Sequence, residues 1–179
     1  RNGMYLFREG SQGSKKVQLL GSGAILREVI AAASILEQDF GVASDIWSAT
    51  SFSELRRDGV DCARWNRLNP EKEPRIPWVT GCLQDREGPV IAASDYVRGF
   101  ADQIRGFLAQ EDYIVLGTDG FGRSDTREQL RSFFEVDRYN IAYAALYALY
   151  RRELLGMSEL LAARTSLGID PDKVNPVLV

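Results

Sequence analysis

The sequence predicts an α/β fold in which helices cover both faces of a sheet. Short apolar runs alternate with helical patterns along the whole chain, which is typical of a layered α/β sheet. One of these runs, Val90–Ala93, is apolar at every position, as a strand covered on both faces requires. No long glycine- or serine-rich linker divides the chain, so we expect a single domain over residues 1–179.

The amino-terminal third is expected to begin with a strand, a tight turn and a helix. Residues 17–20 form the strand, and Gly21-Ser22-Gly23 form the turn. The apolar residues of the helix recur at helical spacing and are Leu26, Val29, Ile30, Ala33, Leu36 and Phe40. Residues 45–50 form the next strand, and Ser51 with Glu54 is a capping box that begins the following helix.

Two breaks are expected in the middle of the chain. Asp58-Gly59 favours an interruption of the helix, which resumes over residues 60–68, and three prolines make residues 69–77 an irregular crossing without a strand. Beyond the strand Val90–Ala93, Asp95 is expected to cap a helix. The apolar positions of that helix are Val97, Phe100, Ala101, Ile104, Phe107 and Leu108.

Three helices are expected in the last third of the chain. Asp125 and Glu128 form a second capping box, which begins a helix that runs through Phe134. Asp137 caps the next helix, which is expected to reach about residue 155.

The last helix is expected from Ser158 to Gly168, because glycine favours the left-handed conformation that ends helices. The tail over residues 175–179 is apolar, so we expect it to dock against the fold, with residues 4–7 adding a further strand to the sheet.

The composition excludes several classes of function. The chain contains no histidine, which removes Ser-His-Asp, Cys-His and histidine-metal sites. A net charge of -3 with dispersed basic residues argues against nucleic acid, and no apolar run approaches the roughly 20 residues of a membrane span. Cys62 and Cys82 lack a CxxC spacing, so we expect neither a zinc site nor a disulfide scaffold, and a cytoplasmic location. The opening Arg1-Asn2-Gly3 suggests a fragment of a longer chain without a signal peptide.

The turn Gly21-Ser22-Gly23 lies between a strand and a helix, where backbone N–H groups can hold a phosphate. Leu26 stands where the dinucleotide-binding fingerprint has its third glycine. A plain tight turn is therefore the favoured interpretation, and a stand-alone nucleotide-binding module stays open as an alternative.

A second motif, Gly117-Thr118-Asp119-Gly120 with Asn140 downstream, resembles the Gly-Asp-Gly and distant Asn that hold magnesium and diphosphate in thiamine enzymes. Thr118 breaks the triplet and the spacing to Asn140 is short. We interpret the motif as a decoy, because a hard cation needs converging oxygen ligands.

The most unusual segment follows the strand expected at residues 113–117. It contains glycines, carboxylates, an arginine and an aromatic residue between a strand and a helix, where ligands and partner domains commonly meet an α/β fold. Its contact candidates are Asp119, Gly120, Phe121, Gly122, Arg123, Ser124 and Asp125. We favour a contact with another domain or subunit over a pure turn, and rank catalysis below both.

The remaining candidates have simpler interpretations. Tyr143, Tyr147 and Tyr150 recur at helical spacing and indicate a core or interface stripe. The three tryptophans, Trp47, Trp65 and Trp78, have no spacing that suggests a binding cage. The two cysteines are expected to be inert, and Arg56, Arg57 and Asp58 to form a solvated helix end.

Four blocks, VQLLGSGAILREV (17–29), SATSFSELRRDGVDCARWNRLNP (48–70), GTDGFGRSDTREQLRSFFEVD (117–137) and DKVNPVLV (172–179), resemble one family in order and spacing. It is the homodimeric, bacterial-type pyruvate dehydrogenase first component, acetyl-transferring. The resemblance implies a three-layer α/β/α domain like the transketolase carboxy-terminal domain, with a five-stranded, mostly parallel sheet that contains one antiparallel strand. A related transketolase-like enzyme is the other alternative.

The resemblance also implies the chemistry of the longer parent. Thiamine diphosphate and magnesium serve there in pyruvate decarboxylation and the reductive acetylation of lipoamide. They lie between the amino-terminal and middle domains of two subunits, so we expect no catalytic, cofactor-binding or metal-binding residue in this chain. Its implied partners are those two domains, the second subunit of the homodimer and the lipoyl acyltransferase component.

Overall fold

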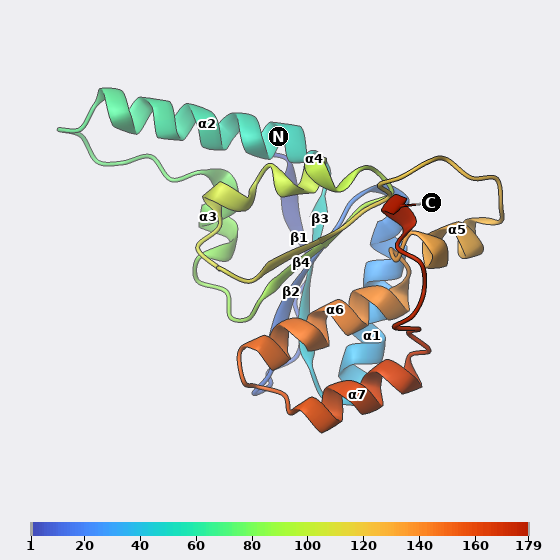
Figure 1. Ribbon diagram of the computed structural model, residues 1–179. Helices are drawn as coiled ribbons and strands as arrows, with labels where there is room; N and C mark the ends of the chain where they lie inside the picture. The colour runs from blue at the N-terminus through green and yellow to red at the C-terminus, as the bar shows by residue number, and fades with distance from the viewer. Residues whose placement is uncertain (1, 179) are drawn as a thin grey trace.

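The computed structural model describes residues 2–178 and contains one five-stranded sheet (Figure 1). The strands are β1 (Met4–Arg8), β2 (Lys16–Gly21), β3 (Ala43–Ala49), β4 (Val90–Ala93) and β5 (Tyr113–Leu116). Their spatial order is β1-β3-β2-β4-β5, with β1 antiparallel to β3 and the other pairs parallel. The mixed, mostly parallel sheet that the resemblance implies is confirmed, as is the strand expected at residues 4–7.

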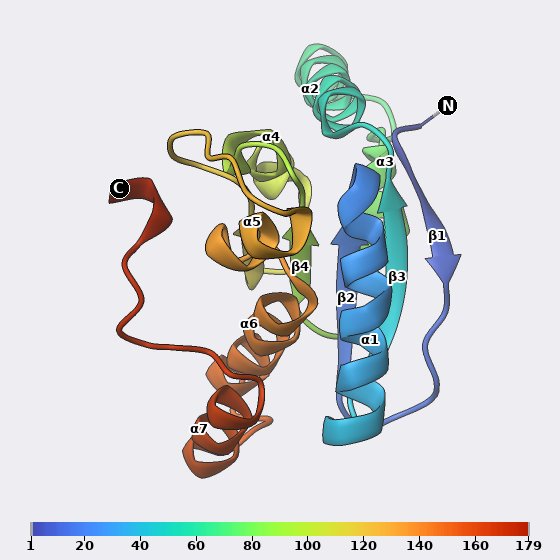
Figure 2. The same cartoon turned by 90° about the vertical axis from the view of Figure 1, so that its right-hand side faces the viewer.

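Helices form a layer on each face of the sheet (Figures 1 and 2). One layer contains α1 (Leu26–Phe40), α6 (Arg138–Arg151) and α7 (Met157–Ser166), which pack with Val17, Leu19, Ile46, Ile91 and Ala93 of the strands. The other contains α2 (Phe52–Leu68), α3 (Trp78–Leu83) and α4 (Arg98–Asp102), over Leu20, Trp47, Val90, Ala92 and Val115. None of the helices within residues 2–178 combines the length and hydropathy that crossing a membrane requires.

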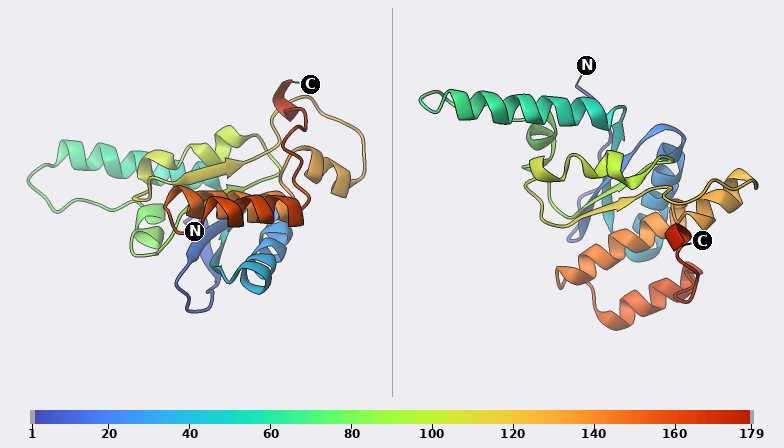
Figure 3. Two further views of the ribbon diagram at one scale, coloured as in Figure 1. Left: turned by 60° about the horizontal axis from the view of Figure 1, so that its bottom comes forward. Right: turned by 45° about the horizontal axis from the view of Figure 1, so that its top comes forward.

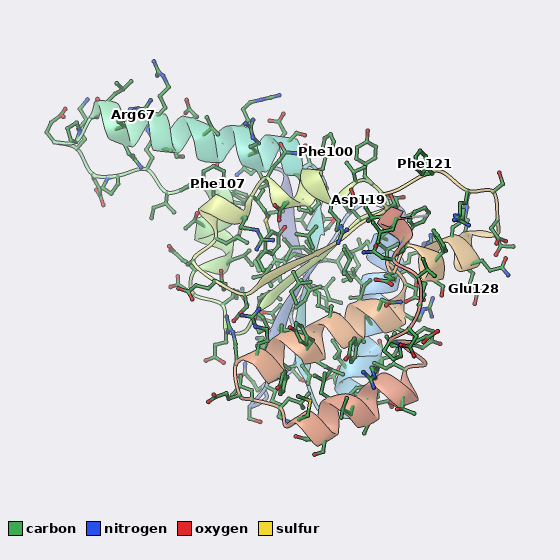
Figure 4. The ribbon with its side chains drawn as sticks, in the orientation of Figure 1. Arg67, Phe100, Phe107, Asp119, Phe121 and Glu128 are labelled. Atoms are coloured by element: carbon green, nitrogen blue, oxygen red, sulfur yellow. The ribbon has the colours of Figure 1, made fainter. Side chains whose placement is uncertain are left out.

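The helix α2 is continuous, so the break expected at Asp58-Gly59 is wrong. Gly59 is buried, and a Cβ added there would lie 2.6 Å from the ring of Phe107. The glycine therefore serves close packing between α2 and Phe107 rather than a change of direction, and Figure 4 shows Phe107 beneath the helix. Ser51 caps α2 as expected by accepting a hydrogen bond from the Glu54 amide.

The far half of α2 and the irregular segment after it project beyond the sheet, which Figure 3 shows from two sides. Residues 69–77 contain no strand, as the prolines predict. The short helix α3 that follows was not expected from the sequence. Its first amide, that of Trp78, donates a 2.6 Å hydrogen bond to Asp58, so this carboxylate joins two helices and is more than a solvated helix end.

The long helix expected from Asp95 to residue 108 is wrong in its beginning and in its length. The chain forms only α4 and a separate 3₁₀ turn at Arg105–Phe107, and α4 begins after Val97, whose extended backbone precludes a cap at Asp95. The apolar spacing predicted the buried positions Ala101 and Ile104, but two glycines in the segment weaken a continuous helix.

Other helix ends differ by a few residues from the ends predicted from the sequence. The cap of α5 (Arg127–Phe133) is Thr126, whose hydroxyl accepts from the Gln129 amide, so the expected cap at Asp125 is wrong. Asp137 caps α6 as expected, but α6 ends at Arg151 rather than near 155. The last helix, α7, begins after Gly156 rather than at Ser158, and Gly168 follows it with the expected positive φ of 68°.

A buried polar network joins the strands on the α2 side of the sheet. Asp45 is fully buried and accepts hydrogen bonds from Gly10 N–H and the Gln18 amide, while Lys16 lies 3.1 Å and Arg86 3.3 Å away. Gln18 in turn accepts a 2.8 Å hydrogen bond from the Trp47 indole. Burial alone raises the pKa of Asp45, but these donors and Lys16 outweigh it and hold the pKa below its ordinary 3.8.

We predict that Asp45→Asn destabilises the fold by about 3 kcal/mol, because it leaves Lys16 and Arg86 near an uncharged group in the interior. Since the pKa of Asp45 is lowered on folding, its contribution to stability is present above pH 3.8 and is lost as pH falls through the folded value. Urea unfolding at pH 7 and under acid conditions measures both effects. Asp39→Asn, at an exposed position, is the matched control; equal stability of the two variants would contradict the prediction.

Candidate functional site at the carboxyl ends of the parallel strands

The candidate site lies where the parallel strands end. The chain passes from β2 through α1 to β3 on one side of β2, and later returns to place β4 on the other side. The connections after β2 and β4 therefore leave the sheet in opposite directions and open a crevice between them, the usual place for ligands in such sheets. The connection after β5, which holds the contact candidates, runs beside this crevice (Figure 1).

A hydrogen bond and an ion pair join the first part of the connection after β5 to the segment after β4. Thr118 N–H donates to the Tyr96 carbonyl at 2.9 Å, and the Arg98 guanidinium binds the Asp119 carboxylate at 2.6 Å. A Cβ at Gly117 would lie 2.6 Å from the Tyr96 carbonyl oxygen, so only glycine allows this approach. Asp119 is thus a link between two loops, visible near the centre of the site in Figure 4.

The next residue, Gly120, is held against the carboxy-terminal tail. Its φ is 115°, and a Cβ there would lie 2.5 Å from the carbonyl oxygen of Pro176. The tail docks through buried Pro176 and through Lys173, which donates to the carbonyls of Ser132 and Phe133. Leu178 is 78% exposed, so the docking expected for the tail is confirmed only in part, and Val179 lies outside the described residues.

Exposed aromatic side chains stand on both loops of the site. Phe121 is 79% exposed, and Figure 4 shows it at the outer side of the loop. The segment after β4 adds Tyr96 and Phe100, whose rings pack edge to face with centroids 4.7 Å apart although both are exposed. Exposed aromatic residues in a group mark contact surfaces in soluble proteins.

The rest of the segment turns back toward α5. The Arg123 guanidinium lies 4.3 Å from the ring centroid of Phe133, Ser124 is exposed, and Asp125 accepts a 2.7 Å hydrogen bond from the Thr126 amide. Gly122 has no atom near the position of an added Cβ. The candidates therefore do not converge on one point: Asp119 and Gly120 fix the loop, and Phe121 and Arg123 present side chains from it.

A cavity of about 490 Å³ lies in the crevice beside α5, and we call it the arginine cavity. Its lining residues are Ala24, Asp95, Thr118, Gly120, Gly122, Arg123, Arg127, Leu130, Arg131, Phe134 and Val136. Arg123 is among the contact candidates predicted from the sequence, whereas Arg127 and Arg131 are not. Their spacing of four residues, which places them on one helix face, was the available signal.

A buried ion cluster holds the wall of this cavity to the core. Glu28 of α1 is 5% exposed and binds both Arg131, at 3.0 Å, and Arg138, at 3.0 Å. Burial raises the pKa of Glu28, but the hydrogen bonds and charge of Arg138, with the charge of Arg131, more than offset burial and lower it overall. One carboxylate therefore orients guanidinium groups from α5 and α6.

The glycine turn after β2 is explained by packing. A Cβ at Gly21 would lie 2.8 Å from Cα of Leu26, and Ser22 N–H donates to the Ala93 carbonyl. The residue that breaks the dinucleotide fingerprint is thus the one that packs against the turn, which favours the tight-turn interpretation.

The thiamine-like motif does not assemble. Asp119 is bound by Arg98, whereas the Asn140 side chain donates to Asp137 at the start of α6. Across residues 2–178, no group of three or more Asp, Glu, Cys or His side chains is placed to hold a metal ion. The two motif residues therefore do not supply converging ligands.

The two cysteines and two of the three tyrosines of the stripe on α6 pack into the fold. Burial raises the pKa of the Cys62 and Cys82 thiols, which disfavours the reactive thiolate. Tyr143 and Tyr150 pack against the core, whereas Tyr147 is 41% exposed.

Comparison with known proteins gives the class of the domain. A family model described as the transketolase-like TK C-terminal domain matches residues 3–137. The chain therefore belongs to the family of transketolase-like C-terminal domains.

Within this class, the chain matches curated proteins named pyruvate dehydrogenase E1 component. The one from Cupriavidus necator is 54% identical over 179 residues, covering 99% of this chain, and the one from Pseudomonas aeruginosa is 52% identical over 176 residues, covering 98%. The one from Escherichia coli K12 is 51% identical over 180 residues, covering 99%. The chain spans only 20% of the length of each. The resemblance found in the sequence is confirmed.

Solved transketolases share the fold. A split gene transketolase described as an inactive beta4 tetramer has a TM-score of 0.56 at 16% identity, over 84% of this chain and 43% of that chain. The Pichia stipitis transketolase complex with sedoheptulose 7-phosphate also has a TM-score of 0.56, at 15% identity, over 86% of this chain and 19% of that chain. At these identities the likeness shows the fold alone.

We predict that Gly120→Ala releases the tail, because an added Cβ meets Pro176 and the backbone has a positive φ. The expected cost is more than about 1 kcal/mol of local stability, with faster hydrogen exchange in residues 173–178. Gly122→Ala is the control, since nothing lies within 4 Å of its added Cβ. Equal exchange of the tail in both variants would refute the contact.

Proposed function

We propose that this chain is the structural and assembly domain of a thiamine-diphosphate-dependent pyruvate dehydrogenase component. The parent enzyme decarboxylates pyruvate and reductively acetylates lipoamide, and this domain fixes the geometry of the parts that carry the reaction. The single observation that carries the proposal is the identity of about half of all residues over nearly the whole chain to pyruvate dehydrogenase E1 components. Identity to the transketolases is only 15–16%, which favours the dehydrogenase over a related enzyme.

The residues of this domain do not fit the cofactor. Thiamine diphosphate, when bound to the parent, supplies the electron sink for decarboxylation. A diphosphate with magnesium needs converging oxygen ligands, and the two side chains of the thiamine-like motif are engaged by different partners, Arg98 and Asp137.

The proposed contribution of the domain is contact. Its exposed aromatic residues, Phe121, Tyr96 and Phe100, stand on two loops that the ion pair of Arg98 and Asp119 joins. Aromatic residues are enriched at protein interfaces. We assign this surface to the rest of the polypeptide or to the second subunit of a homodimer. Small displacements of a reaction centre have large rate costs, so such packing supports catalysis from a distance.

We predict that Phe121→Ala in the full-length parent weakens assembly. Truncating an aromatic side chain that becomes buried in a contact costs about 2 kcal/mol or more of binding free energy. If the contact joins two subunits, sedimentation velocity is expected to show a dissociation constant at least about tenfold higher. If the contact lies within one chain, thermal unfolding is expected a few degrees lower. Pyruvate turnover is expected to fall in either case. Met157→Ala is the control, because Met157 is 51% exposed on α7, away from the site. Unchanged assembly, unfolding and turnover in Phe121→Ala would remove the contact role.

The isolated domain is expected neither to bind thiamine diphosphate tightly in a magnesium-dependent manner nor to decarboxylate pyruvate. Calorimetric titration with the cofactor and magnesium measures the first, and carbon dioxide release the second. Tight, magnesium-dependent binding by residues 1–179 alone would show that the domain contains a cofactor site.

A further inference from the structure

The arginine cavity is a feature that the contact role does not explain. Its volume of about 490 Å³ is in the range of small-molecule sites, and it lies in the crevice between the connections after β2 and β4. Phe121, the most exposed aromatic residue of the contact surface, is not among its lining residues. The loop from Asp119 to Asp125 therefore has two faces, one toward solvent and one toward the cavity.

The charge of the cavity is positive. Arg123, Arg127 and Arg131 line it, and Asp95 is the one carboxylate among the described lining residues. Arg131 is paired with Glu28, but that carboxylate is shared with Arg138, so the cluster keeps a positive charge.

Two of the guanidinium groups are available to a ligand. The ion pairs found within residues 2–178 leave Arg123 and Arg127 without a carboxylate partner. Arg123 is positioned by stacking over Phe133, which leaves its N–H groups to bind other acceptors.

The rest of the wall is apolar. Leu130 of α5 and Phe134, the residue that follows α5, line the cavity, and Ala24 and Val136 complete this part of the lining. An apolar wall beside unpaired guanidinium groups fits a molecule that has an anionic end and an apolar body. A phosphate group matches the guanidinium fork and carries up to two charges, more than a single carboxylate offers.

We propose that the arginine cavity binds a small organic phosphate. Arg123 and Arg127 hold the phosphate group, Arg131 adds charge from its fixed position against Glu28, and the apolar body packs on Leu130 and Phe134. All the residues of the proposed site belong to this domain.

Equilibrium dialysis of the full-length parent with 1-naphthyl phosphate tests the proposal. The enzyme is first loaded with thiamine diphosphate and magnesium and freed of excess cofactor, so that the cofactor site is filled while the arginine cavity is open to the probe. Saturable binding is expected, with weaker binding of inorganic phosphate, none of 1-naphthol, and a loss of affinity as salt is added.

Arg127→Gln and Arg123→Gln are each expected to weaken binding of 1-naphthyl phosphate at least about tenfold, since each removes a charged hydrogen-bond donor. Arg131 is left intact because its loss would also unpair Glu28. Arg67→Gln, at an exposed position at the far end of α2, is the matched control and keeps wild-type affinity (Figure 4).

Absence of saturable binding in the wild type would overturn the proposal and assign the cavity to contact with the rest of the enzyme. Equal affinity in Arg127→Gln and the wild type would also overturn it, by placing the probe elsewhere. The readout is ligand affinity, whereas the contact surface is tested by assembly of the Phe121→Ala variant, so either proposal can fail while the other stands.

Discussion

The constraint on which this structure depends is that its central strands are covered on both faces. The side chains of β3 are buried along its whole length, and β4 is buried at all four positions. Such strands can be connected only by segments that cross the faces of the sheet, and these crossings become the two helical layers. Because β2 to β5 are parallel, the connections that leave their carboxyl ends gather at one end of the molecule, where the contact surface and the arginine cavity lie.

Buried charged side chains then fix the relative positions of strands and helices, which apolar packing alone does not define. Asp45 joins β3 to Lys16 of β2 and to Arg86, and Glu28 joins α1 to Arg131 and Arg138. Apolar contacts are not directional, whereas a buried carboxylate requires its donors at defined positions. The first network sets strand neighbours in the interior, and the second sets the place of α5 beside the cavity.

The surface at the carboxyl ends combines rigidity with exposure. Gly117 lets two loops approach, and the pair of Arg98 and Asp119 joins them, yet the aromatic residues they carry face outward. The chain spans 20% of the length of its curated relatives, and the proposed contact of this surface is with the part of such a longer protein that this chain does not include. We propose a domain that supports chemistry located elsewhere through one face and binds an organic phosphate through another.

The sequence by itself determined the alternation of strands and helices, the buried strand Val90–Ala93 and the glycine-rich loop after β5, because these depend on local apolar periodicity and on glycine. The tertiary structure alone decided that Gly59 lies within a helix, since its role depends on Phe107, which is distant in sequence. It also decided that Arg127 and Arg131 share a cavity with Arg123, because the orientation of α5 is set by Glu28, about a hundred residues earlier in the chain. Local patterns specify which elements form, whereas contacts between distant residues specify which side chains meet.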